Sequence, residues 1–154
     1  MADDEADNLL ERILGGNEMI AVVYWSGTGN TEAMAQAVAK GAGDAKLVNA
    51  DNLGDFDVEG YEKLAFGCPS MGMEQLEESV FEPFFAGIEA NLADKKVVLF
   101  GSYGWGDCSW MRDWEVRVKA SGATLLADGL TINEAPDADG LAACEALGQT
   151  LANG

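Results

Sequence analysis

The chain has 154 residues, of which 48% are hydrophobic, and this length suits one domain with a sizeable core. Its 27 acidic and 9 basic residues give a net charge of −18, which disfavours nucleic acid and anionic membranes as partners and favours basic ones. There is no His, so Ser-His-Asp and Cys-His catalysis are excluded, and we expect no catalytic residue and no metal site.

An acidic segment opens the chain. Residues 1–18 contain six acidic residues and one Arg and have no long apolar run, so a secretory signal is not expected. The segment could form a short amphipathic helix or an extension that frays. We expect it to be an N-terminal extension to a single domain over residues 19–154. The three cysteines are widely spaced and form no zinc or disulfide pattern, which favours reduced thiols in a cytoplasmic protein.

Short apolar runs then alternate with helical patterns. The β-branched and aromatic run 19–25 predicts a buried strand. Four more strands are predicted at 46–50, 63–68, 96–102 and 123–127, and the last could continue through 130–132. Helices are predicted at 31–42, 74–91, 109–121 and 137–151, with Pro83 as a point where the second could kink or break. This alternation predicts an α/β doubly wound domain, with a five-stranded parallel sheet and helices on both of its faces.

Ligands of such sheets bind at the carboxyl ends of the strands, so the loops after the first, third and fourth strands are informative. The first of these loops, Ser26–Thr31, opens a helix. Its glycines let the backbone approach a ligand, and its hydroxyls, amide side chain and helix N-terminus supply neutral donors for an anion. The loop holds no Lys or Arg and lacks both nucleotide-binding glycine patterns, which favours a monophosphate over a dinucleotide or a triphosphate. The simpler alternative is that Ser26 or Thr28 only caps the helix.

The loops after the third and fourth strands carry large apolar side chains where polar ones are usual. Met71 and Met73 lie in the first of them, and Tyr103 and Trp105 lie in the second. Trp105 stands between two glycines, where one face of its ring could stack on something flat. Met71 could cover the opposite face of the same ring with its polarisable sulfur. The alternative is an apolar lid that packs on the protein itself.

Other large side chains are expected to pack inside the domain. Trp110 and Trp114 lie four residues apart in one predicted helix, and Cys144 lies on the apolar stripe of another, so all three are expected in the core. Trp25 comes directly before the first loop and could either pack under it or shield a bound phosphate.

The three loops together resemble those of the short-chain flavodoxins, most closely the flavodoxins of clostridia and other anaerobic bacteria. The matching segments are 24–32, Met71-Gly72 with Glu74, and 99–106, and residues 133–136 before the last helix also match. The likeness covers about residues 19–152 and implies the sheet order 2-1-3-4-5. Long-chain flavodoxins carry an insertion in the fifth strand, for which this chain has no room between residues 123 and 136.

The resemblance implies non-covalently bound FMN, with its phosphate on residues 26–31 and its ring between Trp105 and Met71. It also implies that the backbone of 103–106 meets the pyrimidine edge and that Glu74 accepts the N3 hydrogen. The chain departs from the family at two positions. A small or hydroxyl-bearing residue is common in the family where Pro69 stands, and a small or acidic residue is common where Met73 stands. The expected cofactor-binding residues are Ser26, Gly27, Thr28, Gly29, Asn30, Thr31, Pro69, Ser70, Met71, Gly72, Met73, Glu74, Ser102, Tyr103, Gly104, Trp105, Gly106, Asp107 and Cys108.

These features predict a low-potential one-electron carrier. Gly72 stands where the N5 hydrogen of the reduced flavin would point, and its backbone freedom would let the 72–73 peptide turn a carbonyl toward that hydrogen. None of the three loops contains Lys or Arg, and this disfavours the negative charge that full reduction places on the ring.

The expected partners are basic surfaces of redox proteins such as ferredoxin-type reductases and other oxidoreductases, met by a monomer of this chain. One alternative is a flavin-dependent reductase of the quinone or azo type, and another is a flavodoxin-like activator of a metalloenzyme. A phosphoacceptor receiver domain is disfavoured, because Trp25 and Ser26 stand where a receiver needs acids at the end of the first strand.

Overall fold

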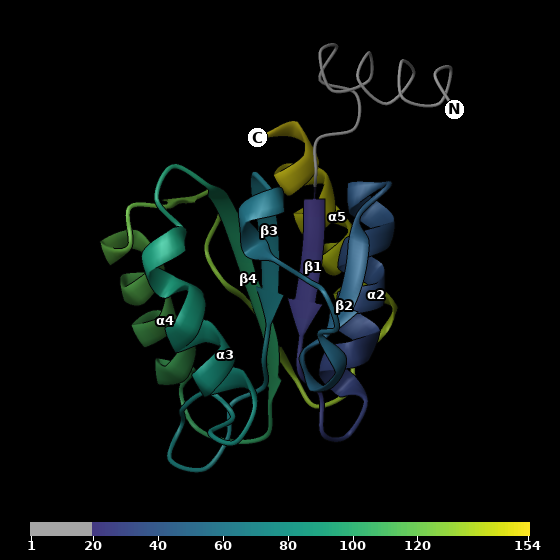
Figure 1. The fold of residues 1–154 in the computed structure, drawn as a ribbon. Helices are drawn as coiled ribbons and strands as arrows, with labels where there is room; N and C mark the ends of the chain where they lie inside the picture. Colours follow the sequence, from purple (N-terminus) through teal and green to yellow (C-terminus); the bar gives the residue numbers. More distant parts are fainter. Residues whose placement is uncertain (1–19) are drawn as a thin grey trace.

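The computed structural model describes residues 20–154, and the extension expected at residues 1–18 lies outside this part of the chain. Parallel strands form one sheet in the order β2-β1-β3-β4-β5, with β6 also paired to β4 (Figure 1). The order predicted from the resemblance is therefore confirmed. The strands are β1 (Ile20–Tyr24), β2 (Lys46–Asn49), β3 (Lys63–Gly67), β4 (Lys96–Tyr103), β5 (Thr124–Leu125) and β6 (Leu130–Asn133).

The outer strand next to β4 is split in two, where the sequence predicts a strand at 123–127 that could run on. β5 pairs with the start of β4, and β6 pairs with its end. Between them the chain is held by α4, because the Gly129 N–H donates to Glu115 Oε2 over 2.6 Å. Gly129 also lies against the Met111 side chain, which leaves no room for a Cβ there. The break therefore follows from contacts with a helix that is distant in sequence.

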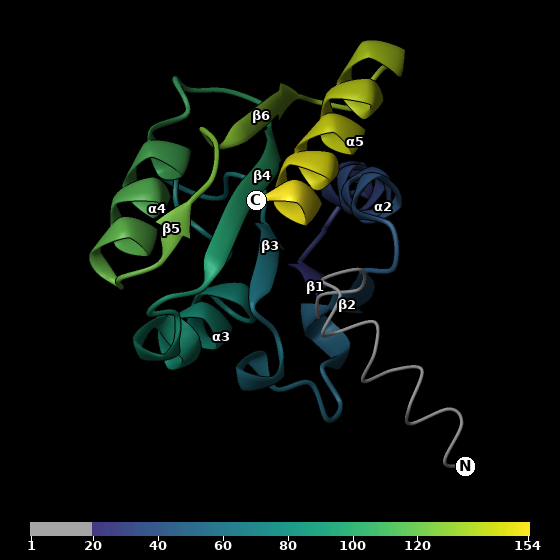
Figure 2. The same ribbon diagram turned by 90° about the horizontal axis from the view of Figure 1, so that it is seen from above.

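Two helices cover each face of the sheet. α2 (Asn30–Ala42) and α5 (Ala138–Asn153) lie on one face, and α3 (Phe81–Ile88) and α4 (Ser109–Ala120) lie on the other (Figures 1 and 2). Short 3₁₀ turns are η1 (Ala50–Asn52), η2 (Val58–Gly60) and η3 (Glu89–Asn91). Because successive side chains of a strand point to opposite faces, Val22 packs under α2 and α5 while Val23 packs under α3 and α4. Burial on both faces explains why β1 is apolar throughout.

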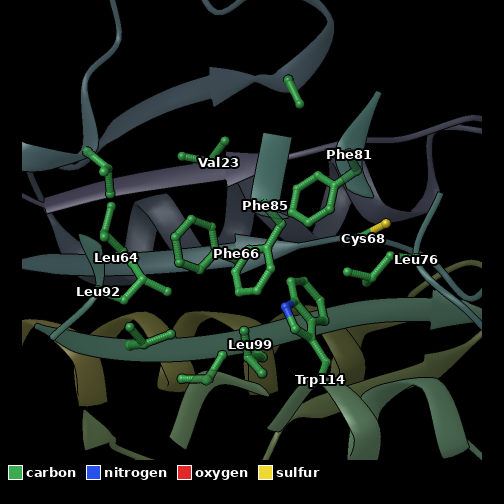
Figure 3. Close-up of a cluster of buried hydrophobic side chains, with 14 of the residues drawn as sticks. Val23, Leu64, Phe66, Cys68, Leu76, Phe81, Phe85, Leu92, Leu99 and Trp114 are labelled. Carbon is green, nitrogen blue, oxygen red and sulfur yellow. The ribbon is translucent and has the colours of Figure 1, made fainter. Parts of the chain in front are cut away.

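Aromatic side chains dominate the core beneath α3 and α4. Figure 3 shows Phe66 of β3 beside Phe85 of α3, and the centroids of the two rings are 5.4 Å apart. The Trp114 ring meets Phe81 and Phe85 edge to face, with centroids 5.5 and 5.7 Å apart. Its indole nitrogen has no conventional hydrogen-bond partner among the described residues, and Figure 3 shows it on the side of the ring toward Phe85.

The residues predicted to be core are buried. Trp110, Trp114 and Cys144 are each no more than 2% exposed, so this prediction is confirmed. Burial raises the pKa of the Cys144 thiol to about 11, which keeps it neutral in the folded protein. Of the two roles open to Trp25, the structure supports packing under the first loop, since a Cβ at Gly27 would lie 3.0 Å from its ring.

The helix predicted at 74–91 is wrong over its first seven residues, because α3 begins at Phe81. Met71 and Gln75 instead pair across a tight turn. The buried Glu77 carboxylate accepts from the N–H groups of Ser79, Val80 and Phe81 over 2.7, 2.8 and 2.8 Å. A carboxylate that binds these amides starts the helix at this point and ends the preceding loop.

Two further observations complete the fold. Pro83 lies in the first turn of α3, where its missing N–H costs no intrahelical hydrogen bond. Arg117 of α4 joins α4 to α3 and its continuation, through bonds to Glu82 over 2.7 and 2.9 Å and to Glu89 over 2.8 and 3.2 Å. The bonds to Glu89 and Glu82 raise the pKa of the Arg117 guanidinium. Arg117 therefore remains positively charged at any relevant pH. Within residues 20–154, the helices are too short or too polar to cross a membrane.

Candidate functional site

A pocket of about 230 Å³ lies where β1, β3 and β4 end at their carboxyl edge. This edge of an open α/β sheet is where ligands bind. The pocket draws on all three loops that the sequence singles out, together with one residue that follows β6. Its lining residues are Ser26, Gly27, Thr28, Asn30, Thr31, Pro69, Ser70, Met71, Ser102, Tyr103, Gly104 and Glu134.

The first loop combines a structural cap with unpaired donors. Ser26 Oγ accepts from the N–H groups of Gly29 and Glu32, both over 3.1 Å, so Ser26 does stabilise the start of α2 as the simpler alternative proposes. The backbone N–H groups of residues 26, 27, 28 and 31, however, find no acceptor within residues 20–154. Unpaired amides at the N-terminus of a 13-residue helix form a site for an anion.

Two buried hydroxyls tie the first loop to the others. Thr31 Oγ1 lies 2.9 Å from Ser102 Oγ, and the Ser102 N–H also reaches Thr31 Oγ1 over 3.4 Å. The Ser102 carbonyl accepts from the Ser70 N–H over 3.0 Å. One residue at the end of β4 therefore fixes the relative positions of all three loops.

The pocket has no positive charge among its lining residues, and Glu134 is the only charged one. An anion bound there would be held by hydroxyls, amides and the positive end of the α2 dipole. This agrees with the expectation of a phosphate held without a cation.

The second loop presents exposed apolar groups on a specific backbone. Met71 is 38% exposed and Met73 is 84% exposed, whereas methionines are usually buried. Gly72 has φ of 54°, a conformation that favours glycine, and a Cβ there would meet nothing closer than 3.8 Å. The backbone at Gly72 is therefore unusual in conformation and open in space.

Glu74 links the second loop to the third. Its backbone is left-handed, with φ of 58°, and its Oε1 accepts from the Ser109 N–H at the start of α4 over 3.2 Å. The same carboxylate packs against the Gly106 backbone, where a Cβ would overlap it. The lone pairs left on this carboxylate can accept another hydrogen, so the role predicted for Glu74 at N3 is chemically compatible with its position.

The third loop exposes Trp105 and leaves several amides unpaired. The Trp105 side chain is 62% exposed although tryptophan is among the most buried residues on average. The N–H groups of residues 104–108 have no acceptor in the described part of the chain. The Tyr103 carbonyl, in contrast, accepts from both the Glu134 N–H over 2.8 Å and Asn133 Nδ2 over 3.3 Å. A fixed carbonyl here orients the peptide that follows it.

The predicted residues fall into two sets. Those that line the pocket come from the ends of β1, β3 and β4, and the others belong to the same three loops but are not among its lining residues. The predicted residues outside the lining are Gly29, Gly72, Met73, Glu74, Trp105, Gly106, Asp107 and Cys108. Glu134 lines the pocket but is absent from the prediction, even though its segment 133–136 is part of the resemblance.

Comparison with known proteins agrees with this geometry. A family profile described as Flavodoxin matches residues 22–148. The flavodoxin of Megasphaera elsdenii is 46% identical over 138 residues, covering 87% of this chain and 98% of the relative. The flavodoxin of Clostridium beijerinckii is 45% identical over 136 residues, covering 86% and 98%.

The chain belongs to the flavodoxin family. The solution structure of two-electron reduced Megasphaera elsdenii flavodoxin superposes with a TM-score of 0.77 at 44% identity, covering 88% of this chain and all of that one. Flavodoxin 2 of Bacillus cereus gives a TM-score of 0.77 at 27% identity, covering 88% and 98%. Flavodoxins bind FMN and transfer electrons without being enzymes, so the predicted cofactor and the predicted class of function are confirmed.

The residues of this chain fit FMN. The unpaired amides of the first loop suit its phosphate, and the two exposed apolar side chains suit its flat ring. The unpaired amides of the third loop suit the polar edge of that ring.

Proposed function

We propose that this chain carries single electrons between redox proteins on one non-covalently bound FMN. When bound, FMN supplies the redox chemistry, because its ring accepts and releases electrons. The observation that carries the proposal is the convergence of unpaired amides and exposed apolar side chains on one sheet edge. Each of these features is costly or unusual by itself, and one ligand accounts for all of them.

The phosphate belongs on the first loop. The N–H groups of residues 26–28 and 31 would donate to its oxygens, and the Thr28 hydroxyl could add a further donor. Such bonds need no cation, because the helix N-terminus contributes roughly half a positive charge. Pro69 lines this pocket without a hydroxyl, so any contact it makes there is apolar.

The ring belongs between the second and third loops. Met71 and Trp105 would cover its two faces and exclude water from them, and both side chains are exposed and able to do so. The amides of residues 104–106 would donate to the carbonyl oxygens of the pyrimidine edge, and Glu74 would accept the N3 hydrogen. Glu74 is held for this role by Ser109.

Basic surfaces of other redox proteins are the proposed partners. The chain has a charge of −18, which steers positively charged proteins toward it and repels negatively charged ones. Met73 and Trp105 are exposed on the second and third loops, where a partner could approach the edge of the ring.

A direct test uses the purified protein. We expect a yellow protein whose flavin is released by acid as FMN, in a ratio of one per chain. We also expect no steady oxidation of NADH by the protein alone, because nothing in residues 20–154 beyond the three loops suggests a nicotinamide site. NADH turnover without a second protein would favour the alternative of a flavin-dependent reductase.

A further inference from the structure

Lysines gather at the edge of the sheet where its strands begin, which is the edge opposite the pocket. β2, β3 and β4 begin at Lys46, Lys63 and Lys96. In the register of the sheet, Ile20 of β1 lies opposite Lys63, and Lys63 in turn lies opposite Lys96. On the other side of β1, Lys46 pairs with the second residue of that strand. The start of β1 is therefore flanked by lysines on both sides.

A polar cavity of about 510 Å³ lies at this edge. Its charged lining consists of three lysines and three exposed acids, which are Lys63, Lys95, Lys96, Glu59, Glu62 and Asp94. Lys63 is only 6% exposed, and the other two lysines are half-buried. Although acids line the same cavity, none of the three lysines forms an ion pair with an Asp or Glu side chain of residues 20–154. Their charge is therefore not balanced by a direct partner in this part of the chain.

Each of these lysines uses one of its hydrogens on a backbone oxygen. The three bonds are all 2.7 Å long, and they join Lys63 to Ala152, Lys95 to Tyr61 and Lys96 to Gly154. Two of the acceptors lie at the end of α5, at the same edge of the sheet (Figure 1), where the helix dipole is negative and favours a cation. An ammonium group has three donors, so two hydrogens on each nitrogen find no acceptor within residues 20–154. These hydrogens are available to an anion.

The chain itself brings anions to this edge. Residues 1–18 contain six acidic residues and one Arg, hence a net charge of −5, and they lead into β1. Glu18 precedes Ile20 by two residues, so its Cα lies within about 7 Å of the Cα of Ile20. Neighbouring strands are only about 4.8 Å apart, which places Lys63 within reach of Glu18. The match to the family profile begins at residue 22, so this acidic segment lies outside it.

We propose that residues 1–18 bind the lysines at this edge through their carboxylates, with Glu18 and the acidic run 3–7 as the two points of contact. Exposed ion pairs are weak between separate molecules. Here the segment is tethered beside the lysines, so its effective concentration is high and weak contacts suffice to hold it. The binding covers a positive surface that would otherwise repel basic partners. This inference goes beyond the proposed function and holds with or without bound FMN.

Trypsin cleavage of the full chain tests the proposal. Arg12 is the only basic residue before Lys40, so trypsin cuts the segment at one place, between the two proposed points of contact. The initial release of fragment 1–12 is followed by mass spectrometry at about 0.01 M and about 1 M salt. A synthetic peptide of residues 1–18 gives the rate for the unbound segment, and thermal unfolding confirms that each protein is folded.

Two variants and one control are compared with wild type. The first variant is Lys95→Gln with Lys96→Gln. The second changes only the segment, so that the described domain is untouched, and it combines Asp3→Asn, Asp4→Asn, Glu5→Gln and Asp7→Asn, with a peptide that carries the same changes as its reference. The control Arg112→Gln removes an exposed cation in the first turn of α4, at the opposite edge of the sheet.

We expect wild type to be cut about tenfold more slowly than the peptide at low salt, because cleavage follows the population of unbound segment. At high salt this difference should largely disappear. Both variants should be cut at nearly the rate of their peptides at low salt, and Arg112→Gln should behave like wild type.

Three results would overturn the proposal. The first is a wild-type rate equal to that of the peptide at low salt, which would mean that the segment is not bound. The second is a slow rate that neither salt nor the two variants change, which would mean that something other than these ion pairs protects Arg12. The third is protection that grows with protein concentration, because a second copy of the chain would then supply the contact.

Discussion

Strained backbone at single residues gathers around the site. Four residues other than glycine have positive φ in residues 20–154, and three of them, Glu74, Cys108 and Glu134, belong to the loops or lining of the pocket. Left-handed backbone costs a side-chain-bearing residue roughly 1–2 kcal/mol, so the surroundings must impose it. For Glu74 and Glu134 the hydrogen bonds described above do so, and both residues are thereby fixed against the third loop.

Replacement of Gly72 by Ala tests the predicted movement of the 72–73 peptide. Space is open around Gly72, so Gly72→Ala changes backbone freedom and creates no clash. If the carbonyl turns toward the reduced flavin, the loss of one hydrogen bond, about 1 kcal/mol, should lower the potential of the first electron by on the order of 40 mV. The measurement is a potentiometric titration.

Gly54→Ala is the matched control for this experiment. Gly54 has φ of 57°, and a Cβ there would meet nothing within 4 Å, so the replacement imposes the same backbone strain outside the three loops and the lining of the pocket. It should leave the potential unchanged. An equally unchanged potential in Gly72→Ala would rule out the movement.

Glu77 makes stability depend on pH. Burial alone would raise the pKa of its carboxyl, but the N–H groups of Phe81, Val80 and Ser79 lower it to below the ordinary value. A depressed pKa contributes stability that is present above the unfolded-state value of about 4.3 and is lost as pH falls through the folded value. Glu77→Gln should therefore destabilise the protein by about 1–2 kcal/mol at pH 7 and by less at pH 3.

Urea denaturation at the two pH values measures this difference. Glu78→Gln, at the exposed neighbouring position, is the control and should have little effect at either pH. A destabilisation by Glu77→Gln that is the same at pH 3 as at pH 7 would contradict the account.

At the scale of elements, α2 and α5 cross at two glycines. A Cβ at Gly148 would overlap the Val38 carbonyl, and a Cβ at Gly41 would overlap the Glu145 carbonyl. Gly148→Ala should therefore destabilise the fold by roughly 2–3 kcal/mol through overpacking. Denaturant unfolding measures the change.

Gly87→Ala in α3 separates packing from helix propensity. A Cβ there would meet nothing within 4 Å, so the replacement should be neutral or stabilising by up to about 1 kcal/mol. If Gly148→Ala were tolerated as well as Gly87→Ala, close contact between the helix backbones would not explain the two glycines.

The elements were predictable where local pattern and tertiary packing agree. The apolar strands and the glycine loop 26–31 can be recognised from the sequence alone. A strand buried on both faces needs a continuous apolar run, and a turn into a helix needs glycine and hydroxyl residues. The start of α3 was not predictable, since Leu76 and Val80 have helical spacing while Leu76 in fact packs into the core from an irregular segment that precedes the helix. Glu77 sets the N-terminus of α3, but nothing in the sequence distinguishes it from the other acidic residues, of which the chain has 27 in all.

Glu134 was missed for the same reason, because its position depends on contacts between segments that are distant in the sequence. The sequence prediction followed loops directly after β1, β3 and β4, and the bond to Tyr103 that brings Glu134 to the pocket depends on how β6 pairs with β4. The split between β5 and β6 likewise depends on Glu115 of a helix earlier in the chain. Such contacts have no local signature in the sequence.

At the scale of the whole molecule, the negative net charge of the protein should help to set the reduction potential of the bound flavin. The protein has a net charge of −18, no cation lines the pocket, Glu134 lines it, and Asp107 lies in the third loop. A negative surrounding disfavours the additional negative charge of the fully reduced ring. Raising the ionic strength from about 0.01 M to about 1 M shortens the screening distance roughly tenfold and should raise the potential of the second electron. A potential independent of salt would show that the net charge has no such role.

One anaerobic redox titration of the purified, flavin-bearing protein, followed by its visible spectrum, tests the central claim most directly. We predict one FMN per chain that takes up its two electrons in two resolved one-electron steps, the second at low potential. A protein that binds no FMN, or one that takes up both electrons in a single unresolved step, would contradict a one-electron carrier.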